Sequence, residues 1–247
     1  MGCTIQCQEQ QFGPIEAVLF DKDGTLANSE PYLYQLGRSR ARFLDAQIPG
    51  VQDPLLMAFG FDEDNQLNPQ GLLAVSSRRD TEIAAAAYVA ETGRGWVESL
   101  KIVNTAFKEA DENMPPKAQA TGLVEGVDEL VRSLHHANIR LGIISSDITQ
   151  NVVKFAHQYD LTAYFEHLLG MDTVDKSNPN ACTDFFLNRG INPARILVIG
   201  DSAADIQLAQ GMGAASIGVI WGWNVAYSIK GAGAIATQPT DIQIVTK

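Results

Sequence analysis

The chain has 247 residues, 45% hydrophobic and 19% charged, a composition typical of globular proteins that bury a core without disulfides or structural metals. Its formal net charge of −11 argues against a general nucleic-acid binder, because such proteins need clustered Lys and Arg. No stretch approaches the ~18 apolar residues that span a bilayer, and we find no signal-peptide pattern, so we expect a cytoplasmic protein without a membrane partner.

The N-terminal segment is polar, and we expect its Cys3 and Cys7 to be loose, reduced thiols. With Cys182 they form neither a disulfide framework nor a zinc-ligand spacing. Residues 15–20 then form a short apolar run that ends in Asp21-Lys22-Asp23-Gly24-Thr25. This pattern predicts a buried strand that delivers polar residues at its C-terminal end.

The segment 28–114 shows no strand pattern and reads as several helices. Ser29 and Pro31 mark the start of one helix, and Thr81–Ala90 is rich in alanine. A further helix has an apolar seam, which we expect to pack in a core, at Trp96, Leu100, Val103, Phe107 and Ala110. Because Pro115-Pro116 breaks this pattern, we predict a helical domain at 28–114, inserted into a core domain formed by 1–27 and 115–247.

Strands and helices alternate in the rest of the chain. We predict strands at 140–144, which ends in Ser145-Ser146-Asp147, and at 195–200, which ends in Asp201, with weaker candidates at 167–170 and 215–220. Helical patterns cover 127–134, 149–158, 179–189 and 203–210, the last ending at Gly211. This alternation predicts an α/β fold, a Rossmann-like parallel sheet with helices on both faces.

Ligands of open parallel sheets bind at the carboxyl ends of the strands. In this chain that edge would gather polar residues from three strands, namely Asp21, Asp23, Ser145, Asp201 and Asp205. Carboxylates packed together raise one another's pKa unless a cation neutralises them. Hard oxygen ligands suit Mg²⁺, so the sequence predicts a magnesium site.

Four short motifs follow one another along the chain. The first is the Asp21–Leu26 run after the apolar strand, and the second is the strand that ends at Ser145. The third is Lys176 followed by Pro179, and the fourth runs from Gly200 to Asp205. Together they resemble the motifs of the haloacid dehalogenase (HAD) superfamily, although the third lacks one proline of the usual Lys-Pro-x-Pro. The helical insert resembles the cap of that family's phosphoglycolate-phosphatase and β-phosphoglucomutase branch. The resemblance covers nearly the whole chain apart from about the first dozen residues.

The resemblance implies a role for each core residue. Asp21 would be the nucleophile that forms a phospho-aspartate, and Asp23 the general acid and base, an aspartate that the related dehalogenases lack. Asp21, the backbone carbonyl of Asp23 and Asp201 would hold Mg²⁺, with Asp205 completing the shell or orienting it. The remaining assignments place Ser145 and Lys176 on the phosphoryl group and Gly24, Thr25 and Ser146 around the substrate. For Ser146 and Asp147 a helix cap is the structural alternative.

The cap of such enzymes contacts the rest of the substrate, and Arg78 and Arg79 are its candidate cations, although a solvated helix start is the simpler explanation for either one. Trp221-Gly222-Trp223 can flank the site or merely pack. We therefore predict a Mg²⁺-dependent phosphatase of small phosphorylated metabolites, phosphoglycolate-like or sugar-phosphate-like. A phosphomutase of the β-phosphoglucomutase type and a non-catalytic binding module are the alternatives, and the oligomeric state stays open.

Overall fold

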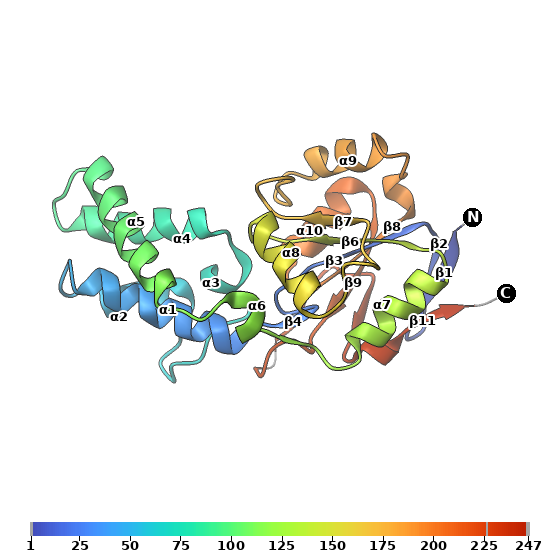
Figure 1. The fold of residues 1–247 in the computed structure, drawn as a ribbon, viewed down its shortest axis with the longest axis horizontal. Helices are drawn as coiled ribbons and strands as arrows, with labels where there is room; N and C mark the ends of the chain where they lie inside the picture. The colour runs from blue at the N-terminus through green and yellow to red at the C-terminus, as the bar shows by residue number, and fades with distance from the viewer. Residues whose placement is uncertain (1, 226, 246–247) are drawn as a thin grey trace. The chain divides into compact units, whose positions relative to one another are not determined.

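The computed structural model describes residues 2–225 and 227–245, and the chain forms two compact units. The core unit comprises Met1–Ser29 and Thr121–Lys247, and the helical unit is the continuous segment Glu30–Ala120. Figure 1 shows the elements of each unit. In the described residues, no helix is long and apolar enough to cross a membrane.

The core unit is built on a six-stranded parallel sheet in the order β10-β9-β8-β3-β6-β7. The bounds are β3 (Ala17–Phe20), β6 (Arg140–Ile144), β7 (His167–Leu169), β8 (Ile196–Gly200), β9 (Ala215–Val219) and β10 (Ala234–Ala236). Every residue of β3 and β8 is buried, because helices cover both faces of the sheet. The strands predicted from apolar runs are therefore present.

Side chains alternate between the two faces of the central strand. Val18 and Phe20 pack with α7 (Val127–His136) and α8 (Thr149–Gln158), whereas Ala17 and Leu19 pack with α9 (Pro179–Leu187) and α10 (Ala203–Met212). The layers seen in Figure 1 are thus two hydrophobic cores separated by one sheet.

A three-stranded antiparallel sheet, which the sequence did not reveal, joins residues from both ends of the core unit. Its order is β11-β1-β2, with β1 (Cys3–Cys7), β2 (Gln10–Ile15) and β11 (Ile242–Val245). Cys7 is fully buried in it and Cys3 is half-buried, so the expectation of loose thiols was wrong. Burial, with a smaller effect of Asp241, raises the pKa of the Cys7 thiol to about 11.

The last helix of the core unit passes the glycine at which we expected it to end. The helix α10 continues to Met212, and Gly213, with a φ of +70°, follows it. Gly211 instead lies against Pro179, where an added Cβ would come within 2.5 Å of the proline ring. The smaller elements of this unit are β4 (Ala27–Asn28), β5 (Gly122–Leu123), η1 (Pro193–Arg195) and η2 (Pro239–Asp241).

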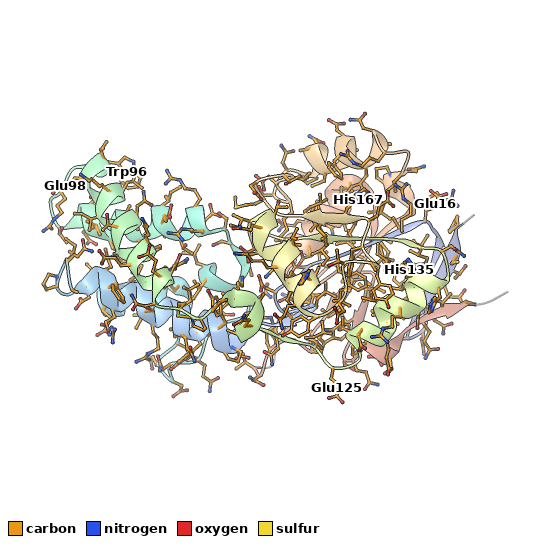
Figure 2. The ribbon with its side chains drawn as sticks, in the orientation of Figure 1. Glu16, Trp96, Glu98, Glu125, His135 and His167 are labelled. Carbon is orange, nitrogen blue, oxygen red and sulfur yellow. The ribbon has the colours of Figure 1, made fainter. Side chains whose placement is uncertain are left out.

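The helical unit contains α1 (Glu30–Asp45), α2 (Gln52–Phe59), α3 (Leu72–Val75), α4 (Arg78–Glu91), α5 (Trp96–Glu112) and α6 (Lys117–Ala120). The predicted seam on α5 is buried at Val103, Phe107 and Ala110. It does not reach Trp96, which is 47% exposed at the start of the helix (Figure 2), so the expectation that Trp96 packs in this core was wrong.

A buried arginine ties the helices of this unit together. Arg40 of α1 donates to Asp111 of α5 through Nε and Nη2, at 3.0 and 3.2 Å, and its guanidinium lies over the ring of Phe107 at 4.8 Å. Arg78, the first residue of α4, also donates to Asp111. One carboxylate therefore links three helices.

Candidate active site

The ends of neighbouring parallel strands bring three aspartates together. Asp21 follows β3, and its backbone N–H donates to the carbonyl of Ile199 in β8 at 2.9 Å. Asp201 follows β8, and Asp205 lies in the first turn of α10. One carboxylate oxygen from each lies within 4.8 Å of the others, and all three residues are buried. The strand-end pattern therefore places these side chains as the sequence predicted.

Two glycines make room for this cluster. Gly24 has a φ of +85°, and a Cβ there would come within 2.2 Å of Asp201 Oδ2 and 2.5 Å of Trp223 Nε1. A Cβ at Gly200 would come within 2.3 Å of Asp205 Cγ. The backbone therefore approaches the carboxylates closely at both positions, which side chains would prevent.

Lys176, from the loop between β7 and α9, lies among the aspartates. Its Nζ is 2.7 Å from Asp21 Oδ1 and 2.9 Å from Asp205 Oδ1, and the residue is only 7% exposed. Burial alone would lower the pKa of the lysine, but the charges of Asp205 and Asp21 outweigh it and raise that pKa above its ordinary value. The change in the third motif thus leaves the ammonium in contact with the cluster.

One ammonium does not neutralise three buried carboxylates. Burial raises the pKa of Asp21 to about 7, against the opposing effect of Lys176 and with further increases from Asp205 and Asp23. Burial, together with the charges of Asp21 and Asp205, also raises the pKa of Asp201 well above its ordinary value. The cluster therefore favours the uptake of protons or of a cation.

Neighbouring groups hold two of the aspartates in place. Asp205 Oδ2 accepts from the backbone N–H and the hydroxyl of Ser202, at 3.0 and 2.6 Å, so both of its oxygens are engaged. Asp201 Oδ2 accepts from Trp223 Nε1 at 2.7 Å, and Thr25 Oγ1 lies 3.3 Å from its Oδ1. Trp223 thus flanks the site, one of the two alternatives that the sequence offered, although its hydrogen bond to Asp201 was not predicted.

The donor set suits a hard divalent metal ion. Carboxylate oxygens from three sequence-distant residues converge in a buried place, and the burial raises the cost of leaving them unneutralised. Asp21, Asp201 and Asp205 each offer one carboxylate oxygen to such an ion. Both oxygens of Asp205 also bond Lys176 and Ser202.

Asp23, two residues after Asp21, has its own partners outside this cluster. Its Oδ2 accepts from Lys22 Nζ at 2.7 Å, and its Oδ1 accepts from the hydroxyl of Ser29. Lys22 Nζ also lies 3.3 Å from Asp147 Oδ2. Ile148, not Ser146 or Asp147, is the N-cap residue of α8, so the predicted helix cap was wrong and Asp147 pairs with the lysine instead.

The second predicted motif lies at the same edge of the sheet. Ser145 is buried directly after β6, the strand that pairs with β3, and its Oγ accepts from the backbone N–H of Asp147 at 3.1 Å. Ser146, the next residue, is half-buried. Their substrate contacts stay predictions.

The two predicted cap cations have carboxylate partners within the helical unit. Arg78 Nε is 2.8 Å from Glu82 Oε1, and Arg79 Nη1 is 3.6 Å from Glu82 Oε2. Ser77 is the N-cap of their helix, and its backbone N–H donates to Asp80. The structural alternative of a helix start thus describes where they lie, and a role in substrate binding stays a prediction.

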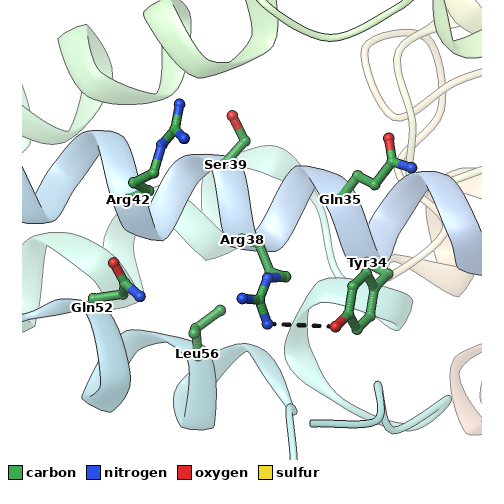
Figure 3. A pocket seen from close by; sticks show the side chains of 7 residues that line it. All are labelled: Tyr34, Gln35, Arg38, Ser39, Arg42, Gln52 and Leu56. Carbon is green, nitrogen blue, oxygen red and sulfur yellow. Dashed lines mark hydrogen bonds between the residues drawn. The ribbon is translucent and has the colours of Figure 1, made fainter.

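The helical unit also has a pocket of about 410 Å³ between α1 and α2 (Figure 3). Arg38 is oriented there, because its Nη1 lies 3.4 Å from Tyr34 Oη and 2.9 Å from Asn65 Oδ1. The lining contains two arginines and no carboxylate, and consists of Tyr34, Gln35, Arg38, Ser39, Arg42, Gln52 and Leu56.

Comparisons with known proteins give one consistent family. The model of the haloacid dehalogenase-like hydrolases matches residues 18–219. A phosphoglycolate phosphatase from Synechococcus elongatus is 24% identical over 218 residues, which is 88% of this chain and 90% of that protein. A crystal structure of a predicted phosphoglycolate phosphatase from Haemophilus somnus has a TM-score of 0.67 at 19% identity, covering 92% of this chain and 96% of the other. CbbY from Rhodobacter sphaeroides, solved in complex with phosphate, has a TM-score of 0.58 at 18% identity, covering 91% and 95%.

Proposed function

Because this chain belongs to the haloacid dehalogenase-like hydrolase family, as its four motifs predicted, we propose that it is a Mg²⁺-dependent phosphatase of small phosphate monoesters. One observation carries the proposal. Asp21 is buried, bonded to Lys176 and clustered with Asp201 and Asp205, while a second carboxylate follows it at Asp23. Phosphoryl transfer needs this combination of nucleophile, positive charge and nearby acid.

In the first step, a carboxylate oxygen of Asp21 attacks the phosphorus of the monoester. The bond from phosphorus to the leaving oxygen breaks as the aspartyl phosphate bond forms, and Asp23 gives its proton to the leaving oxygen. The ammonium of Lys176, 2.7 Å from Asp21 Oδ1, offsets negative charge on the transferring group. An alcohol leaves, and the phosphoryl group remains on Asp21.

In the second step, water attacks the phosphorus of the phospho-aspartate. Asp23, now a carboxylate, takes a proton from this water, and the bond between phosphorus and Asp21 breaks to release inorganic phosphate. Asp21, Asp201 and the backbone carbonyl of Asp23 would hold Mg²⁺, which supplies positive charge to the phosphoryl oxygens when bound. Asp205 would orient these groups.

The relatives support a small phosphorylated substrate, because the Synechococcus elongatus protein is named as a phosphoglycolate phosphatase. We assign phosphoglycolate-like or sugar-phosphate-like esters to this chain as the substrate class. The helical unit would act as the cap that selects among them, and its arginines are the groups to test first, because a guanidinium binds carboxylate and phosphate well.

The deciding experiment measures inorganic phosphate release from a panel of phosphorylated metabolites, with and without Mg²⁺. The wild type should release phosphate from a subset only when Mg²⁺ is present, and Asp21→Asn should be inactive while folded. Asp64→Asn, at an exposed position of the helical unit, is the matched control and should retain activity. Isomer formation without phosphate release would instead indicate the phosphomutase, and a fully active Asp21→Asn protein would refute the mechanism.

A further inference from the structure

Lys22 is a lysine that the proposed reaction does not use, although it lies between the proposed nucleophile and the proposed general acid. Its side chain is 1% exposed, which is rare for lysine unless the ammonium is paired. The ammonium has two carboxylate partners, Asp23 at 2.7 Å and Asp147 at 3.3 Å. The fold thus buries a positive charge within the first motif.

Both oxygens of the Asp23 carboxylate are held by this arrangement. Lys22 donates to Oδ2, and the hydroxyl of Ser29 donates to Oδ1. A carboxylate bonded on both oxygens has little freedom to rotate about its side-chain torsions, because rotation would break at least one charge-assisted hydrogen bond. The orientation of Asp23 therefore depends on where Lys22 is fixed.

Lys22 is fixed by the loop that follows β6. Asp147, its second partner, accepts through Oδ1 from the backbone N–H of Ile148 and from Asn151 Nδ2, both at 2.8 Å. The ring of Phe155, in the same helix as Asn151, lies 5.9 Å from the ammonium. A continuous set of contacts thus connects Asp23, through Lys22, to the start of α8.

We propose that Lys22 is a positioning residue, which holds the carboxylate of Asp23 in the orientation required for proton transfer to and from the reacting oxygens. The inference rests on the proposed function, in which Asp23 protonates the leaving oxygen. General acid catalysis requires hydrogen-bond reach of the reacting atom, so a misoriented Asp23 slows reactions whose leaving group needs a proton. The first step should be affected much less when the leaving group departs as a stable anion, whereas the second step, in which Asp23 takes a proton from water, is common to all substrates.

The test compares two substrates in the full-length protein. One is an alkyl phosphate that the wild type hydrolyses, and the other is p-nitrophenyl phosphate, whose leaving group needs no proton. Lys22→Met should lower kcat/KM, which reports the first step up to departure of the leaving group, by ~10- to 100-fold for the alkyl phosphate and by less than ~3-fold for p-nitrophenyl phosphate. Lys22→Arg should recover part of the loss, and Lys154→Met, at an exposed position of α8, is the matched control.

A double-mutant cycle separates positioning from general damage. In the Asp23→Asn background, Lys22→Met should add little to the loss on the alkyl phosphate, because both changes remove the same proton transfer. Asp147→Asn, which weakens the support of Lys22, should lower kcat/KM in the same substrate-selective way. It also carries the test if Lys22→Met does not fold.

Equal losses of kcat/KM on the two substrates, or fully additive losses in the cycle, would overturn the role of Lys22. A wild type that hydrolyses neither substrate would overturn the proposed function instead, so the two failures are distinguishable.

Discussion

Replacing Lys176 by methionine tests whether the buried aspartates depend on this single ammonium. The change keeps the length of the side chain and removes two charge-assisted contacts, at 2.7 Å to Asp21 and 2.9 Å to Asp205. Removing one partner of a buried ion pair costs about 3–5 kcal/mol, because it leaves charge without compensation. In Mg²⁺-free buffer at pH 8, we expect the free energy of unfolding to fall by that amount.

The loss should be smaller at pH 5. The folded-state pKa of Asp21, about 7, already exceeds its ordinary value of 3.8, and removing the lysine raises it further. A carboxylate with a raised folded-state pKa destabilises the folded state at high pH and does so less as pH falls, because the folded state then binds the extra proton. The loss in unfolding free energy therefore shrinks by about 1.4 kcal/mol for each pH unit over which the folded variant binds one proton more than the folded wild type.

Urea unfolding followed by tryptophan fluorescence at both pH values measures this effect. Lys154→Met, exposed on α8, should change stability by less than about 0.5 kcal/mol at either pH. A Lys176→Met loss below about 1 kcal/mol, or an equal loss at pH 5 and pH 8, would refute the reasoning.

Three further outcomes follow from the same structure. Mg²⁺ should raise the melting temperature more at pH 8 than at pH 5, because protons compete for Asp21, whose pKa burial raises to about 7; an equal shift in thermal scans at both pH values would contradict this. Gly24→Ala should abolish phosphate release and cost more than about 2 kcal/mol in urea unfolding, whereas Gly50→Ala, also at positive φ but in open space, should show only the backbone cost of about 1–2 kcal/mol and keep activity. Arg40→Met should cost about 1–3 kcal/mol, since it removes one of the two arginine partners of the partly exposed Asp111, and hydrogen exchange should rise in α1 and α5; unchanged exchange there would argue against the helix link.

The main features of the site were predictable because they depend on local patterns. Continuous apolar runs, typical of strands buried on both faces of a sheet, mark β3, β6 and β8. Each run ends abruptly in polar residues. Parallel strands place such endings at one edge, which brings Asp21 and Asp201 together without any knowledge of the loops.

Features that depend on distant contacts were not predictable. The strand β2 is mostly exposed and has no apolar run, and β1 finds its partner β11 near the opposite end of the chain. The indole of Trp223 and the ammonium of Lys22 were visible as residue types, but Asp201, the partner of Trp223, and Asp147, the second partner of Lys22, come from other loops. Such pairs are set by tertiary packing, which the local periodicity of a sequence does not predict.

The pairing of β1 with β11 has a consequence for synthesis on the ribosome. The helical unit is one continuous segment, Glu30–Ala120, so all of its packing partners are synthesised before strands β6 to β10 of the sheet. The strand β1 is made first but gains its β11 neighbour only after Ile242–Val245 leaves the exit tunnel. We therefore expect the inserted helices to fold while the sheet they interrupt is still incomplete. Strand β1 should pair with β11 only after both strands have been synthesised.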